Sequence, residues 1–373
     1  MFTAILVPAL LLTLVGAWVL WPTGERPVLH TAGPGMTFPS VTVAEVHPGE
    51  ADPMKQVRAT QADGSSVWVQ VPAEYLPEIH VGDRVIAADL GDAAQPGSAL
   101  VFTDFVRGPP LLLLAVVFVV LVVAVARWRG FASLVGLGIS LGVIGVFMLP
   151  ALLEGKPALP VALVTASAIM FVVLYLAHGF TLRTSTALVG TLLGLLATGF
   201  LAAWASGAAH LTGLSDEYAL DLLSYAPQAR MSAILLCGMV TAGLGVLNDV
   251  TITQASAVWE LHGATPGASW RELFGRGMRI GRDHIASTVY TIVFAYVGAT
   301  LPLVLLVSIS DRGMLDALTS GELAEEVART LVGSIGLVLA IPFTTAVAAW
   351  VVRSGGPVAV APAEPGLVDV AVP

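Results

Sequence analysis

The chain has 373 residues, of which 56% are hydrophobic and only 12% charged, with a mean hydropathy of +0.85 and a net charge of −9. A soluble domain carries about 25% charged residues, so this balance excludes a water-soluble enzyme. Several apolar runs reach the roughly 18 residues that cross a hydrocarbon core, which predicts a multi-pass α-helical membrane protein. No nucleic-acid partner is expected, because that function needs a clustered basic face.

The first apolar run extends from Phe2 to Trp21 within a predicted anchor at residues 1–22, and its end carries Trp18, Trp21 and Pro22, as is typical of a membrane interface. No Lys or Arg precedes the run, so the basic segment of a secretory signal peptide is missing. Val15-Gly16-Ala17 does offer small residues of the kind that signal peptidase accepts, which keeps a cleaved signal peptide open as the alternative. We favour an N-terminal transmembrane anchor.

Residues 27–108 are less hydrophobic and contain turn residues between short alternating stretches. Val67, Val69 and Val71 alternate with other residues at the period of two that is typical of a half-buried strand. Ala62-Asp63-Gly64-Ser65 before them has the composition of a hairpin turn. We predict a small extracytoplasmic all-β domain, similar to an OB-fold barrel, between the first two transmembrane helices. Its strands are expected at residues 40–46, 55–60, 67–71, 84–88 and 99–105.

From residue 109 to residue 352 the chain alternates long apolar runs with short loops, which predicts a seven-helix membrane domain. With the anchor, that makes about eight transmembrane helices. The predicted spans are residues 109–127, 131–149, 159–178, 185–206, 230–250, 285–308 and 330–352. Residues 353–373 are rich in Pro, Gly and Ala, and we expect a disordered cytoplasmic tail there.

Arginines in the short loops predict the orientation, because Lys and Arg gather on the cytoplasmic side. The arginines of this kind are Arg127, Arg129, Arg183, Arg271, Arg276, Arg279, Arg282 and Arg353. All of them fall on one side of the predicted spans. Both termini of an eight-span chain then lie in the cytoplasm, and the β domain lies outside.

Charged groups cost at least about 2.5–3.5 kcal/mol at the middle of a membrane, so each one needs an explanation. A first set of polar residues directly follows an apolar run. In a helix, Asp249, Thr253, Ser256 and Glu260 would lie on one face, at i, i+4, i+7 and i+11. Asn248 and Gln254 accompany this first polar stripe.

A second polar stripe begins the next span, where Asp283, Ser287, Tyr290 and Thr291 share a face and Arg282 adjoins it. Because unsatisfied polar groups in hydrocarbon are expensive, we expect the stripes to pair or to line a water-filled cavity. A transport pathway and a buried polar pair that holds two helices in register are equally acceptable interpretations. If its helix is straight, Asp249 lies roughly 27 Å from the start of the span, near the cytoplasmic surface.

Residues 268–282, between the stripes, interleave apolar side chains with four arginines. This pattern predicts an amphipathic helix in the cytoplasmic interface, with the arginines towards anionic headgroups. A helix that docks a protein partner is the alternative.

Catalytic and cofactor motifs are absent: the sequence has no H-E-x-x-H pair, no G-x-x-x-x-G-K-[ST] loop and no G-x-S-x-G elbow. The single cysteine, Cys237, lies in an apolar run, which excludes a disulfide within one chain. We therefore expect no enzymatic activity, no cofactor and no metal, and an intramembrane enzyme is the least favoured class.

Two blocks of the sequence resemble the YibE/F family of bacterial multi-pass membrane proteins. One is Gly243-Leu244-Gly245-Val246-Leu247-Asn248-Asp249-Val250, followed by Thr253-Gln254-Ala255-Ser256 and Glu260. The other is Glu272-Leu273-Phe274, Gly277-Met278 and Ile280-Gly281-Arg282-Asp283, continuing to Ala295-Tyr296-Val297-Gly298. Asn248 and His284 stand where the family more often has small or apolar residues. The resemblance implies a polytopic fold and a role for Asp249 and Asp283, without naming a substrate or a reaction.

We expect a secondary permease or channel-like transporter of the bacterial cytoplasmic membrane. Asp249 is expected to bind a coupling ion or proton, and Arg282 and Asp283 to form an inner gate, with hydroxyl groups of both stripes as lining. The alternative is a non-catalytic assembly or sensing protein of the cell envelope, whose β domain binds a ligand or partner. The lipid bilayer and a small ion or solute are the expected partners, and close-packing glycine pairs also permit a homo-oligomer.

Overall fold

The computed structural model describes residues 2–24, 27–28, 32–33, 35–46, 54–90, 100–215, 218–311 and 313–354, so nearly all of the tail expected at 353–373 lies outside the described residues. The chain divides into two compact units. The barrel unit is Val28–Val125, and the helical unit combines Met1–Pro27 with Ala126–Pro373.

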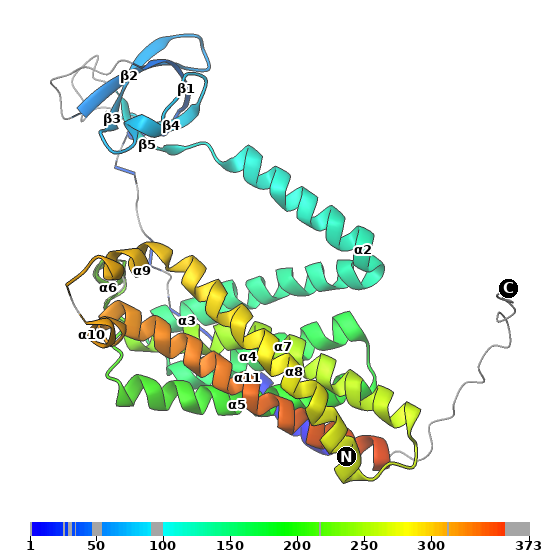
Figure 1. Cartoon of the computed structure of the whole chain (residues 1–373). Coiled ribbons are helices and arrows are strands. Elements are labelled where there is room, and N and C mark those ends of the chain that lie inside the picture. Colours follow the sequence, from blue (N-terminus) through cyan, green and yellow to red (C-terminus); the bar gives the residue numbers. More distant parts are fainter. Residues whose placement is uncertain are drawn as a thin grey trace, which may run out of the picture. The chain divides into compact units, whose positions relative to one another are not determined.

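The barrel unit contains a closed barrel with the strand order β1-β2-β3-β5-β4 (Figure 1). Strands β3 and β5 pair in parallel, and the other neighbours are antiparallel. Each strand lies within one residue of its predicted position at both ends, which confirms the predicted small barrel. The elements are β1 Ser40–Val46, β2 Met54–Thr60, β3 Ser66–Pro72, the short 3-10 helix η1 Leu76–Glu78, β4 Arg84–Ala88 and β5 Leu100–Phe105.

The barrel has its own hydrophobic core, because alternate residues of each strand point inwards. Val57, Val69 and Val85 are among its fully buried side chains. At the β2–β3 turn, Gly64 adopts a φ of 85°, which favours glycine. Asp63 accepts hydrogen bonds from the Ser65 hydroxyl at 2.6 Å and from its backbone N–H at 2.9 Å, and these two bonds hold the pKa of the Asp63 carboxyl below its usual value.

Helices form almost all of the remaining described chain (Figure 1). They are α1 Phe2–Val19, α2 Gly108–Val143, the π-helical turn η3 Ile144–Met148, α3 Leu149–Leu153, α4 Ala158–His178, α5 Leu182–Ala208, α6 Ala219–Tyr225, α7 Met231–Ala264, α8 Trp270–Ala299, α9 Leu301–Ser308, α10 Met314–Leu318 and α11 Gly321–Ser354. Arg127 interrupts α2 with a φ of 53° and a ψ of −131°.

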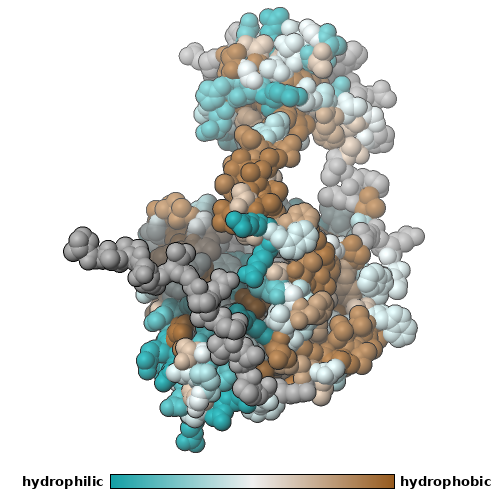
Figure 2. Space-filling model, turned by 90° about the vertical axis from the view of Figure 1, so that its right-hand side faces the viewer, coloured by the Kyte–Doolittle hydropathy of each residue, from teal (hydrophilic) through white to brown (hydrophobic). Residues whose placement is uncertain are grey.

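Among the described residues, six helical runs are long and apolar enough to cross a membrane, and α8 with α9 makes a seventh if that pair forms one span. The count differs from the predicted eight because Gly108–Leu153 is a single run of 46 residues by this criterion, where the sequence suggests two spans. Figure 2 shows hydrophobic surface over much of the helical unit, beside an area of hydrophilic surface. These features indicate a multi-pass membrane protein.

The segment around residue 282 differs from the prediction of an interfacial helix at 268–282 followed by a span at 285–308. Instead, α8 runs unbroken from Trp270 to Ala299, and α9 follows with a bend of 76°. Ser269 and Glu272 form a capping box that starts α8. Pro302 at the start of α9 has no N–H to continue the helical hydrogen bonding, so the break falls there rather than at the charged residues near 282.

Helices α5, α7 and α11 pack against one another at the centre of the helical unit through small residues. Gly190 of α5 lies against Thr344 of α11, Gly336 of α11 lies against Thr198 of α5, and Gly243 of α7 faces Gly333. Thr191 and Thr251 share a buried hydrogen bond of 2.6 Å between α5 and α7.

Helix α1 packs on α4 as part of the helical unit. Leu6 belongs to the main hydrophobic core, and a Cβ at Gly16 would lie 2.6 Å from Cγ2 of Val164. Trp21, just after the helix, contacts the Phe147 ring, with centroids 5.9 Å apart. This close packing makes α1 part of the folded helical unit.

Candidate functional site

The first polar stripe lies on α7, and most of it is accessible. Asp249, Thr253 and Glu260 are exposed, Asn248 and Ser256 are half-buried, and Gln254 is completely buried. The Thr253 hydroxyl donates to the backbone oxygen of Asp249 at 2.8 Å. No side chain of the described residues forms a hydrogen bond or an ion pair with the Asp249 carboxylate.

The second polar stripe lies on the exposed side of α8. Arg282, Asp283, Ser287, Tyr290 and Thr291 are all exposed, and the Ser287 and Thr291 hydroxyls donate to backbone oxygens of their own helix. The buried side of α8 carries instead Leu273, Gly277, Gly281 and Ile292. Within the described residues, no hydrogen bond or ion pair joins the two stripes, so the first of the two expected arrangements, direct pairing, is not observed. Helical spacing shows which residues share a face, but the small and apolar residues decide which face packs.

Gln254 has a different role from its neighbours in the sequence. Its Nε2 donates to the backbone oxygen of Gly277 at 2.8 Å and to the Thr345 hydroxyl at 2.7 Å, which joins α7 to both α8 and α11. Its Oε1 is buried without a hydrogen-bond partner. For this residue, the geometry favours the interpretation as a polar group that holds helices in register.

One face of α7 is open along most of the helix, and we call it the α7 face. It consists of small and polar residues three or four positions apart, so they form a single line. Its members are Gly238, Ala242, Gly245, Asp249, Thr253, Ser256 and Glu260, each of them exposed or half-buried. The line is roughly 33 Å long at 1.5 Å per residue, comparable to a hydrocarbon core of about 30 Å.

The α7 face begins in a pocket of about 640 Å³, which we call the outer pocket. Gly238 and Ala242 line it together with other residues of α7 and with residues of α6, α8 and α11. Its polar or charged lining residues include Tyr296, Glu325 and Arg329.

Glu325 is only 8% exposed, and its Oε1 accepts a hydrogen bond of 2.9 Å from the backbone N–H of Gly213. Gly213 has a φ of 69°, and a Cβ there would lie 2.5 Å from the backbone oxygen of Met231, so only glycine suits this position. No cationic side chain of the described residues pairs with Glu325. The pocket therefore holds a carboxylate without a counter-ion.

Arg329 adds an ion pair to the outer pocket. Its Nη1 lies 2.6 Å from Oε1 of Glu326, and its Nε is buried without a hydrogen-bond partner. Because Glu326 neutralises Arg329, Glu325 is the charged lining residue that has no ion-pair partner among the described residues.

A second pocket, of about 450 Å³, opens beside the other end of the α7 face, and we call it the basic pocket. Ser256 belongs both to the face and to the pocket. The pocket is lined by Arg129, His178, Thr181, Leu182, Arg183, Thr184, Ile252, Ser256 and Trp259. Arg183 also pairs with Glu260, with 3.2 Å between Nη2 and Oε1. Asp249 lies between the outer and basic pockets along the helix.

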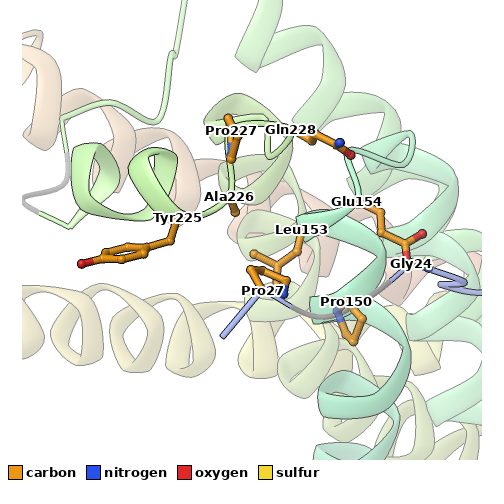
Figure 3. A pocket seen from close by; sticks show the side chains of 9 residues that line it. All are labelled: Gly24, Pro27, Pro150, Leu153, Glu154, Tyr225, Ala226, Pro227 and Gln228. Carbon is orange, nitrogen blue, oxygen red and sulfur yellow. The ribbon is translucent and has the colours of Figure 1, made fainter. Parts of the chain in front are cut away.

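A third pocket, of about 420 Å³, lies where the chain leaves α1 (Figure 3). Its lining is largely proline and aliphatic, and Glu154 is its acidic residue. Glu154 already accepts a hydrogen bond of 2.6 Å from the Gly24 N–H and lies 3.6 Å from Nζ of Lys156. In Figure 3 its carboxylate points towards Gly24, while the Tyr225 ring points away from the labelled cluster. The hydrogen bond from Gly24 to Glu154 joins the segment after α1 to the end of α3. Because the Glu154 carboxylate is already paired, the pocket has little polar capacity left for a ligand.

The sequence-based predictions do not single out Glu325, Glu326 and Arg329, because these residues precede the predicted span at 330–352. In the structure α11 begins at Gly321, so the three residues occupy its first turns. The signal was present in the spacing, since an acidic residue and Arg329 three or four positions later share a helix face. Among the described residues, no group of three His, Cys, Asp or Glu side chains is placed to hold a metal.

The helices and the barrel together define a polytopic helical membrane protein that carries a small β-barrel. The family model for YibE/F-like proteins matches residues 114–354, well over half of the chain, and the protein belongs to this family. This match confirms the resemblance seen in the sequence. It covers the membrane helices from within α2 onwards and leaves the barrel outside. No curated protein and no solved structure matches the chain.

Proposed function

We propose that this YibE/F-like protein is a secondary permease or channel-like transporter for a small cation or proton, with the α7 face as its pathway. The position of Asp249 carries the proposal. Asp249 is the nineteenth of the 34 residues of α7. A hydrocarbon core takes up about 20 helical residues, and every stretch of 20 residues within α7 includes Asp249. Within these stretches Asp249 ranges from the fifth to the nineteenth residue, and an exposed carboxylate inside the hydrocarbon core is costly unless water or an ion reaches it.

Glu325 supports a cation as the substrate class. It is a second carboxylate without a cationic partner among the described residues, and it faces the outer pocket from which the α7 face starts. We assign Glu325 to the entrance and Asp249 to the central site, with the Thr253 and Ser256 hydroxyls as lining. Arg282 and Asp283, expected as an inner gate, lie on the exposed side of α8, and no contact supports that role.

The proposal includes a topology of eight spans. In this topology, the run Gly108–Leu153 contains two spans, one on each side of Arg127. Helices α8 and α9 together form one span. The barrel, which we consider OB-like, is then extracytoplasmic, and both termini lie in the cytoplasm of a bacterium. Two contacts support a common cytoplasmic side for the arginines. Arg183 donates to Glu260, and Arg353 donates to the Ala268 backbone oxygen at 3.5 Å. The lipid bilayer and a second copy of the chain are proposed partners, and no catalytic residue, cofactor or nucleic acid is needed.

A non-catalytic assembly or sensing protein of the envelope is the second candidate. The observation in its favour is the barrel's separate hydrophobic core, which suits a binding module. Removal of residues 38–105 distinguishes the two functions. Unchanged flux in that variant means that transport does not require the barrel, whereas a wild type without flux favours the assembly or sensing role.

Ion flux in proteoliposomes tests the transporter directly. The purified chain is reconstituted with an internal pH dye under an imposed membrane potential, and wild type is compared with Asp249→Asn and Glu325→Gln. Both variants are expected to lose most of the flux because each removes a proposed ion-binding charge. Asp221→Asn, at an exposed position of α6, is the matched control and should retain it. Equal flux in all four proteins at equal folded yield would refute the pathway.

A further inference from the structure

The basic pocket has a chemistry that the proposed cation pathway does not use. Arg129 and Arg183 converge on it from α2 and α5, and His178 at the end of α4 also lines it. Arg183 is half-buried and paired with Glu260, whereas the exposed Arg129 side chain has no partner among the described residues. The charges of Arg129, Arg183 and Glu260 sum to +1. The basic pocket therefore suits an anionic ligand.

The first turn of α5 adds hydrogen-bond donors to this pocket. Thr181, Leu182, Arg183 and Thr184 all line it, and Thr181 caps the helix by accepting from the Thr184 N–H at 3.1 Å. The N–H groups of Leu182 and Arg183 have no partner within the helix, and the helix dipole makes this end partly positive. Two arginines beside a long helix's first turn match the oxygen atoms of a phosphate group.

The surroundings of the pocket favour a lipid over a soluble phosphate. Phe180, just before α5, is 88% exposed, and Trp128, next to Arg129 in the chain, is 75% exposed. Leu182 is exposed as well, and Trp259 forms part of the pocket wall. Exposed aromatic and aliphatic side chains of this kind mark the level where headgroups meet acyl chains.

We propose that the basic pocket binds the phosphate of an anionic phospholipid headgroup, with the acyl chains over Phe180 and Leu182. This site adjoins one end of the proposed transport pathway, with which it shares Ser256, but phosphate binding there does not depend on transport. Arg129 and Arg183 hold the phosphate, and the first turn of α5 supplies backbone donors.

Native mass spectrometry of the full-length protein tests the site. The protein is titrated in detergent with phosphatidylglycerol, with zwitterionic phosphatidylcholine, and with inorganic phosphate as the soluble source. Wild type should retain phosphatidylglycerol in preference to the other two. Arg129→Gln should weaken this binding by about fivefold, as should Arg183→Gln, because a basic residue near an anionic headgroup contributes about 1 kcal/mol. Arg271→Gln and Arg279→Gln, exposed arginines of α8, are the matched controls and should bind as wild type does.

If Arg183→Gln does not fold, Arg129→Gln still tests the site, because the Arg129 side chain makes no hydrogen bond or ion pair with the described residues. An equal loss in the control variants would show that the net charge, and not the pocket, holds the lipid, and would overturn the proposal. Equal retention of the two lipids would also overturn it. Inorganic phosphate that displaces phosphatidylglycerol at similar concentration would reassign the pocket to a soluble ligand, contrary to the proposal.

Discussion

Gly281 of α8 occupies a position where the structure leaves no room for a side chain. A Cβ there would lie 2.5 Å from Cγ2 of Ile341 on α11 and 3.3 Å from the amide of Gln254. Carbon atoms in contact normally lie about 3.5–4.0 Å apart. Ile341 is completely buried, so it has little space to move away. We therefore expect Gly281→Val to displace α8 from α11 by on the order of 1 Å.

The expected cost of Gly281→Val has two parts. Overpacking a close-packed interior costs about 1–3 kcal/mol. The displacement also weakens the hydrogen bond from Gln254 to the Gly277 backbone, which contributes about 1 kcal/mol. The sum is about 2–4 kcal/mol, and the better helix propensity of valine offsets only a few tenths of it. Gly275→Val is the matched control on the same helix, because a Cβ at Gly275 would have no atom within 4 Å.

Cys237 provides the assay, because it is the single cysteine of the chain and is buried in the helical core. A thiol-reactive fluorescent dye added during heating in detergent labels Cys237 only when the helical unit opens. Gly281→Val should lower the labelling midpoint by on the order of 2 °C per kcal/mol, and Gly281→Ala by less. Equal midpoints for Gly281→Val and Gly275→Val would show that the described contact between α8 and α11 is wrong.

The same assay checks two further glycines. Gly213→Ala should destabilise the protein by about 2 kcal/mol or more, because its positive φ alone costs a non-glycine residue about 1–2 kcal/mol and its Cβ would meet the Met231 backbone. Gly207→Ala, with open space around it, should be neutral or stabilising, and a similar loss there would contradict the reasoning. Gly16→Leu should lower the midpoint by forcing α1 away from Val164, whereas Val15→Leu at the exposed neighbouring position should not. An unchanged midpoint for Gly16→Leu would mean that α1 does not pack as described.

The barrel and the spans could be predicted from the sequence because each depends on a local pattern. Val67, Val69 and Val71 alternate with other residues because a strand turns one side to the core, and the run after residue 109 is apolar because lipid surrounds it. The extent of α8 could not be predicted in the same way. Arg282 and Asp283 suggested the start of a span, but charged residues do not end a helix, and Pro302 does.

Which polar residues become buried and which remain exposed depends on contacts between helices that are distant in the sequence. Asp249 and Gln254 are five residues apart and were predicted as members of one polar region, yet one is exposed and the other completely buried. The glycines at positions 277 and 281 explain the difference, because they let α8 approach Gln254 closely. Periodicity contains no information on which neighbour comes close, so the outer pocket with Glu325 and Arg329 could not be derived from it.

Asp283 presents a different physical problem from Asp249. Helix α9 is bent by 76° from α8, so its eight residues add only about 3 Å of depth along the α8 axis at 1.5 Å per residue. Helix α8 must then supply the span, and every stretch of about 20 of its 30 residues includes Asp283, the fourteenth. Unlike Asp249, Asp283 does not lie on a face that joins two pockets. An exposed carboxylate at the middle of a membrane costs at least about 2.5 kcal/mol, and no cation of the described chain pairs with Asp283. A counter-ion for Asp283 then has to come from outside the described chain, and the second copy included in the proposed function is one source of it.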